Sequence, residues 1–121
     1  VQIHDNVLHS QVSASTAALF LIKNSHHVSI RNNHATVVAN GGTGQALAFT
    51  DNNSYIDFSD NTLFFSGTVP TTDIHTYLLA GGVTITNLSG TGNTANIARC
   101  YIVSTYTITG AIETNGTDMC P

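Results

Sequence analysis

Residues 28–33 read Val-Ser-Ile-Arg-Asn-Asn, and variants of this six-residue pattern recur along the chain. The copies begin at positions 1, 28, 56, 83 and 106, so that successive starts are 27, 28, 27 and 23 residues apart. Near-constant spacing is typical of folds built from stacked units. Each copy alternates apolar and polar residues, as does a strand with one buried face. We expect Val28 and Ile30 to point inward and Ser29 and Arg31 outward.

Each predicted strand ends in residues that favour a sharp corner. The fifth position of the pattern is Asp, Asn or Gly, namely Asp5, Asn32, Asp60, Asn87 and Gly110. These residue types tolerate the left-handed backbone conformation that a tight corner needs. The sixth position is asparagine in the first three copies. We expect Asn6, Asn33 and Asn61 to stack as a ladder of side-chain hydrogen bonds.

A second strand precedes each of the later copies, and Ala18–Ile22 aligns with Ala46–Thr50. A third short strand is predicted after the asparagine corner. Two or three short strands every 27 or so residues are the plan of a parallel β-helix, so we predict an all-β, right-handed parallel β-helix (β-solenoid) of about five coils. Residues 1–121 would form a single domain. A β-sandwich would explain the strands but not the matched corner columns.

The composition excludes two classes of partner. Only 8% of the residues are charged, whereas 41% are hydrophobic, and the net charge is −4. The basic side chains are Lys23, Arg31 and Arg99, which are too few for a nucleic-acid-binding patch. No apolar run is long enough to span a bilayer, so we expect no membrane insertion. Low charge with abundant Thr and Asn is typical of extracellular fibres and repeat proteins.

Two cysteines, Cys100 and Cys120, enclose a loop near the end of the sequence. A disulfide between them would contribute about 3 kcal/mol by loop closure. It would also fix the tail over the last coil, whose end otherwise exposes unpaired backbone. Two unpaired, buried thiols are the alternative, and the sequence leaves both possibilities open.

The repeat V/I-x-I/F-x-N/D-N, with its asparagine corner, resembles the right-handed parallel β-helix superfamily of pectate-lyase-like proteins. The resemblance covers nearly the whole chain, and it is specific for the fold only. Members include polysaccharide lyases and hydrolases, phage tailspikes and bacterial surface fibres, so the fold does not fix the function. The character of the sequence is closest to tailspike and surface-fibre domains. This implies a fragment of a longer fibre or spike protein, located outside the cell or on the surface of a virion.

Few residues offer catalytic chemistry. The outward columns are predicted to contain Gln2, Ser29, Asp57, Thr84 and Thr107, and His4, Arg31, Ser59, Thr86 and Thr109. A lyase would need several calcium-binding carboxylates, whereas Asp57 is the single carboxylate in these columns. A hydrolase would need two or three close carboxylates, and Asp60 belongs to the corner. The six histidines lack metal-binding spacing. We predict no catalytic residues, no metal and no cofactor.

We therefore predict a non-enzymatic domain of the fibre or tailspike type that recognises a cell-surface polysaccharide or another glycan. Its predicted binding groove consists of Gln2, His4, Arg31, Asp57 and Ser59. The alternative is a polysaccharide lyase or hydrolase, or a fragment of one, with the same groove as its active site. Release of new reducing ends or of unsaturated uronates from polysaccharides would distinguish the enzyme.

Outward-facing apolar residues predict assembly. If Leu19 and Leu21 face the core, Phe20 and Ile22 face outward, and Phe64 alternates outward on its own strand. Exposed apolar side chains on one solenoid face are typical of a subunit interface. We expect a homotrimer, the state that the resemblance implies, with Phe20, Ile22 and Phe64 in the interface. The alternative is that loops of the same chain cover these residues.

Overall fold

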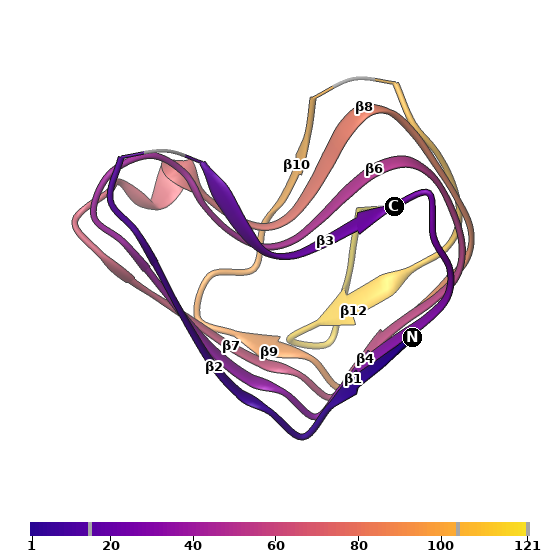
Figure 1. The fold of residues 1–121 in the computed structure, drawn as a ribbon, viewed down its shortest axis with the longest axis horizontal. Helices are drawn as coiled ribbons and strands as arrows, with labels where there is room; N and C mark the ends of the chain where they lie inside the picture. The colour runs from indigo at the N-terminus through magenta and orange to yellow at the C-terminus, as the bar shows by residue number, and fades with distance from the viewer. Residues whose placement is uncertain (15, 104, 121) are drawn as a thin grey trace.

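The computed structural model describes residues 1–14, 16–103 and 105–120 and is built almost entirely of β-strands (Figure 1). The elements in chain order are β1 (Gln2–His4), β2 (Val7–Val12), β3 (Ala17–Lys23), β4 (His26–Arg31), β5 (His34–Ala39), β6 (Gly44–Ser59), β7 (Thr62–Gly67), the 3-10 helix η1 (Thr71–Asp73), β8 (Ile74–Ser89), β9 (Thr94–Ala95), β10 (Cys100–Ile102), β11 (Thr107–Gly110), β12 (Ile112–Thr114) and β13 (Thr117–Met119). No helix in the described part of the chain has the length and hydropathy of a membrane span.

The strands stack as a parallel β-solenoid of about three turns (Figure 1). One sheet has the order β1-β4-β6-β8-β10, with β3 beside β6 and β11 beside β8, and a second sheet has the order β2-β5-β7-β9. The strand pairs of both sheets are parallel. A chain that returns to the same face once per turn produces this order. The prediction of an all-β parallel β-solenoid is confirmed, but the prediction of five coils is wrong.

The predicted number of coils was too high because the fourth and fifth copies of the pattern do not stack on the third copy. They stack beside the corner that directly precedes the third copy. Ile56 pairs with Leu88 and not with Val83. The corner that precedes the fourth copy is lengthened by Gly81 and Gly82, whose φ angles are 67° and 65°. The alternation of apolar and polar residues is the same on every half-buried strand, so it could not reveal this shift.

The corner after the repeated strand has the predicted backbone. Asp5, Asn32 and Asp60 all lie in the left-handed region, with φ of 58°, 53° and 57°. A residue with a Cβ atom enters this region at a cost, and asparagine and aspartate enter it most readily. The chain therefore turns at the same place in successive coils.

A ladder of asparagine amides runs behind this corner, with Asn33 and Asn61 fully buried. The backbone N–H and the Nδ2 of Asn33 both donate to Oδ1 of Asn61, each at 3.0 Å. Asn6 donates in the same way to Asn33, at 3.1 and 3.0 Å. Asn61 donates to Asn93, at 3.0 and 3.2 Å. The ladder therefore passes through the three predicted asparagines and continues to a fourth.

Apolar side chains fill the interior of the solenoid, and the aromatic rings of this core meet edge to face. Phe58 contacts Phe20 with ring centroids 6.3 Å apart and Tyr77 with centroids 5.9 Å apart. Phe58 and Tyr77 are completely buried. Burial of this kind is the main stabilising contribution to the fold.

The orientation of β3 is the reverse of the prediction. Phe20 and Ile22 point into the core with 8% and 6% exposure, whereas Leu21 is 60% exposed. The predicted alignment placed Phe20 beside Ala48, but β3 pairs it with Leu47. A slip of one residue moves every side chain of a strand to the opposite face. Phe20 and Ile22 are therefore core residues of the single chain.

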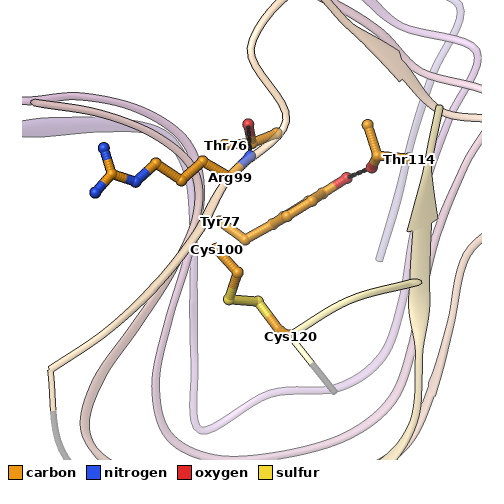
Figure 2. Close-up of a disulfide and its surroundings, with 6 residues drawn as sticks. All are labelled: Thr76, Tyr77, Arg99, Cys100, Thr114 and Cys120. Carbon is orange, nitrogen blue, oxygen red and sulfur yellow. Dashed lines mark hydrogen bonds between the residues drawn. A yellow bond between two sulfur atoms is a disulfide. The ribbon is translucent and has the colours of Figure 1, made fainter. Parts of the chain in front are cut away.

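The C-terminal segment closes one end of the core. The antiparallel hairpin β12–β13 lies within the outline of the coils (Figure 1), and its residues Ile112 and Thr114 are buried. Figure 2 shows the Tyr77 hydroxyl bonded to the hydroxyl of Thr114. Burial raises the pKa of Tyr77 to about 12. Cys100 on β10 and Cys120 after β13 are joined by a disulfide, which ties the hairpin to the solenoid wall.

The ladder predicts a large effect of removing one amide. Replacing Asn33 by leucine should lower the free energy of unfolding by about 1–3 kcal/mol, because Asn6 and Asn61 lose buried hydrogen bonds. Denaturant titration measures this change. Asn6→Leu is the matched control: Asn6 is the exposed first member of the ladder and should cost less. Equal stability of the parent and Asn33→Leu would contradict a stabilising ladder.

The disulfide predicts that alkylation depends on reduction. The thiols of Cys100 and Cys120 should react with an alkylating reagent only after treatment with a reductant, as measured by intact mass. Reduction should also lower the free energy of unfolding by about 3 kcal/mol, because it releases the loop closure in the unfolded chain. Two thiols that are alkylated in the unreduced native protein would exclude the bridge.

Candidate functional site

The predicted groove residues lie together on the outward face of the first sheet. Two columns cross β1, β4 and β6, one made of Gln2, Ser29 and Asp57 and the other of His4, Arg31 and Ser59. The structure thus brings all five predicted residues onto one face. The next strand contributes a residue that the sequence did not indicate, since Asp57 pairs with Ser89 and not with Thr84.

Asp57 is the centre of this polar face. Ser59 Oγ donates to its Oδ1 at 2.6 Å, and Ser89 Oγ donates to the same oxygen at 3.4 Å. The other oxygen accepts from Ser29 Oγ at 3.2 Å and forms an ion pair with Arg31 Nε. Both carboxylate oxygens are therefore occupied by donors from three adjacent strands.

The surroundings of Asp57 hold it in its charged form. Burial acts to raise the pKa of this carboxyl, but hydrogen bonds from Ser59 and Arg31, together with the charge of Arg31, outweigh it. The pKa of Asp57 is consequently lowered from its ordinary value of 3.8. A general acid needs a raised pKa, and a base or nucleophile needs a free oxygen. In this structure Asp57 is an ionised carboxylate that accepts hydrogen bonds on both oxygens.

A second carboxylate, Asp5, stands at the corner next to this face. Its Oδ2 lies 2.7 Å from Nδ1 of His4, and both side chains are well exposed. Glycoside hydrolysis uses a pair of carboxyl groups that flank one bond, one of them with a raised pKa. The two carboxylates are each engaged by a different basic residue, which does not resemble such a pair.

An open groove of about 480 Å³ adjoins Asp57 on the side away from Gln2 and His4. Its lining includes Tyr55, Asp57, Asn87, Ser89, Thr109 and Gly110. The backbone N–H of Asn87 donates to the Thr109 hydroxyl at 2.9 Å, which fixes that side of the groove. The groove therefore offers hydroxyl and amide groups beside one aromatic ring.

Tyr55 occupies an unusual position at the rim of this groove. Its backbone has φ of 54°, and its side chain remains 53% exposed. The ring stacks on that of His27, which also has a left-handed backbone, with centroids 4.7 Å apart and planes 10° apart. Left-handed conformations of bulky residues are costly and concentrate at functional sites. In this chain the left-handed backbone recurs at the corners, so it is the exposed and stacked ring that marks Tyr55 as a functional candidate.

Tyr55 is not among the site residues predicted from the sequence. The signal was available, because His27 and Tyr55 each directly precede a copy of the repeated strand, at Val28 and Ile56. An aromatic ring at the same position in two successive coils must stack if the coils stack. Neither Ser89 nor Asn87 could be predicted as a site residue, because their placement depends on the shifted register of β8.

The histidines were expected not to form a metal site. The left-handed backbone of His27 nevertheless places the Nδ1 atoms of His26 and His27 3.1 Å apart. Among residues 1–14, 16–103 and 105–120, no three His, Cys, Asp or Glu side chains lie close enough to hold a metal ion.

The sequence matches no protein-family model and no curated protein, and the structure matches no solved structure. The resemblance to pectate-lyase-like proteins is supported at the level of a parallel β-solenoid, without a family match. The functional interpretation therefore rests on the geometry of the polar face and its groove.

The lowered pKa of Asp57 predicts how stability depends on pH. Because the folded-state pKa lies below 3.8, the ionised form stabilises the fold above this value, and the contribution is lost as the pH falls through the folded pKa. Asp57→Asn should lower the free energy of unfolding by about 1–3 kcal/mol at neutral pH. The difference in the free energy of unfolding between this variant and the parent should shrink as the pH falls below 3.8. Urea titrations at several pH values measure it.

The control for this experiment is Asp118→Asn, which changes an exposed carboxylate on β13. It should leave stability unchanged at each pH. If Asp57→Asn lowers the free energy of unfolding equally at low and at neutral pH, the charge of Asp57 is not what stabilises this face.

Proposed function

We propose that this solenoid is a non-enzymatic display domain that binds neutral glycans in the groove beside Tyr55. The observation that carries the proposal is an exposed aromatic ring next to fixed polar groups of Asn87, Ser89 and Thr109. A sugar ring has a flat face of C–H groups and a rim of hydroxyls. It therefore needs an aromatic surface and hydrogen-bonding groups side by side.

The charges of the chain favour a neutral ligand over an acidic one. The Nζ of Lys23 lies 3.6 Å from Oδ2 of Asp51, and Arg31 forms an ion pair with Asp57. The third cation, Arg99, donates to a backbone carbonyl at 2.8 Å. The net charge is −4. A uronate-rich polysaccharide would meet a net negative charge, so its binding would be opposed electrostatically.

The groove is also preorganised, which reduces the entropic cost of binding. Asp57 and Ser89 lie on adjacent paired strands, and Tyr55 is packed against His27. Side chains whose positions are already fixed lose little freedom when a ligand binds. A regular, rigid surface of this kind suits repeated recognition of a polymer.

The alternative function, a polysaccharide lyase or hydrolase, has less support. It would need a carboxyl group with a raised pKa or a set of free carboxylates for calcium. Asp57 has a lowered pKa and four hydrogen-bond donors. We therefore favour binding without cleavage.

Location outside the cell or on a virion, within a fibre or spike, and homotrimeric assembly are parts of the same proposal. An interface would not include Phe20 and Ile22, because both side chains lie in the core. Phe64 on β7 is 50% exposed and remains available for contact with another subunit.

Substitution of Tyr55 tests the proposal. A panel of immobilised neutral glucans, mannans and galactans, with pectate as the acidic member, identifies a ligand, and calorimetry then measures its affinity. Tyr55→Asn keeps a residue that tolerates a positive φ. It should weaken neutral-glycan binding about tenfold, since losing one aromatic contact costs roughly 1–1.5 kcal/mol.

The matched control is Tyr101→Asn. Tyr101 also stacks on a histidine, His75, with centroids 4.3 Å apart, but it does not line this groove. This variant should keep the parental affinity. Absence of binding to every neutral polysaccharide, or unchanged binding by Tyr55→Asn, would contradict the proposal. Newly formed reducing ends would favour the enzyme.

A further inference from the structure

Two neighbouring histidines at the start of β4 bring two ring nitrogens together. The Nδ1 atoms of His26 and His27 lie 3.1 Å apart. Successive side chains of a regular strand point to opposite faces, so adjacent histidines ordinarily diverge. His27 has a left-handed backbone, with φ of 56°, and this corner turns its ring toward that of His26. Both residues are exposed, so the pair is open to a ligand from solution.

The backbone before this pair and the ring of His27 are both held in place. The N–H of Ser25 donates to Oδ1 of the buried Asn53 at 3.0 Å, and the carbonyl of Ser25 accepts from the N–H of Ser54 at 3.0 Å. The His27 ring stacks on that of Tyr55, with planes 10° apart. Donors that are fixed before binding lose little freedom when a ligand arrives.

The separation of the two nitrogens suits two donors on one metal ion. Imidazole nitrogens bind a transition-metal ion at about 2.0–2.1 Å, so a spacing of 3.1 Å corresponds to an angle of about 100° at the metal. This angle lies between the right angle of a tetragonal site and the wider angle of a tetrahedral one. The two rings are nearly perpendicular, at 89°, with centroids 5.4 Å apart. Two rings in this arrangement can approach one ion without overlapping.

We propose that His26 and His27 form a binding site for a divalent transition-metal ion, with Cu(II) as the preferred ion. Cu(II) binds nitrogen donors more strongly than the other divalent first-row metals, and its tetragonal geometry accepts two donors side by side. Zinc sites in proteins ordinarily have three or four protein ligands. The net charge of −4 favours the approach of a cation. The proposal does not depend on glycan binding.

The two imidazoles leave the other positions of the ion open. Across the residues that the structure describes, no third His, Cys, Asp or Glu side chain completes a set with them. Water would therefore occupy the remaining positions. In the free protein, a proton on one Nδ1 can be donated to the other. Metal binding requires a lone pair on both Nδ1 atoms, so each neutral ring then carries its proton on Nε2.

Copper titration tests the proposal. Cu(II) is added to the unmodified protein, calorimetry measures affinity, and electron paramagnetic resonance counts the nitrogen ligands. We expect one site with two nitrogen ligands. His26→Ala and His27→Asn should each weaken binding by at least about tenfold, because even outer-shell partners of a metal site contribute about 10–100-fold to affinity. Asparagine at position 27 tolerates the positive φ.

The matched controls are His9→Ala and His34→Ala, which remove other exposed histidines and should keep the parental affinity. Parental affinity in both His26→Ala and His27→Asn would overturn the proposal, as would the absence of Cu(II) binding at millimolar concentration. Zn(II) that binds more tightly than Cu(II) would overturn the choice of metal.

A third control addresses a different pair of donors. Nδ1 of His4 lies 2.7 Å from Oδ2 of Asp5, so this pair could also contact a cation. His4→Ala should leave the two-nitrogen copper signal unchanged. Loss of that signal in His4→Ala would place the copper at His4 and would contradict the proposed site.

A measurement on the unmodified protein needs no substitution. Paramagnetic Cu(II) broadens the nuclear magnetic resonance signals of nearby groups. Substoichiometric Cu(II) should broaden the ring signals of His26, His27 and Tyr55 first. The rings of His75 and Tyr101, which form a second stacked pair, should stay sharp. Broadening that begins at any other histidine would contradict a site at His26 and His27.

Discussion

The buried amides of Asn33 and Asn61 are the constraint on which the stacking of the coils depends. Each of these fully buried side chains accepts two hydrogen bonds from one neighbour and donates to the next. An unpaired buried amide costs about 1–3 kcal/mol, so a slip of one coil against another would be penalised at several rungs at once. Apolar packing stabilises the column, but packing alone is tolerant of sliding. The amide ladder selects one register, and the corner backbone and the outward columns follow from that register.

This constraint also explains which features the sequence could predict. The motif that ends in Asn6, Asn33 and Asn61 located three stacked corners correctly, because both its spacing and its chemistry are specific. Asn93 was missed because 32 residues, and not 27 or 28, separate it from Asn61. The longer coil contains η1 and the Gly81–Gly82 corner, where no amide ladder sets the register. There, period-two alternation was the only guide, and it cannot distinguish neighbouring registers.

The candidate site is a consequence of the same stacking. Arg31, Asp57 and Ser89 are far apart in the sequence, and the register of three successive strands makes them neighbours. The sequence predicted the first two because they belong to correctly aligned copies. Tyr55 could not be recognised from its own segment, since its exposure and its contact with His27 arise only when two corners stack. Polar recognition and structural rigidity therefore have a common origin, which is why binding without catalysis suits this surface.

Hydrogen exchange of the asparagine side chains tests the central claim most directly. Both Nδ2 protons of Asn33 and of Asn61 have hydrogen-bond acceptors, and both side chains are buried, whereas Asn40 is exposed. If the ladder fixes the register, the Nδ2 protons of Asn33 and Asn61 should exchange only through global unfolding, at rates that follow the free energy of unfolding. Those of Asn40 should exchange freely. Side-chain amides of Asn33 and Asn61 that exchange as fast as Asn40 in the folded protein would contradict the account.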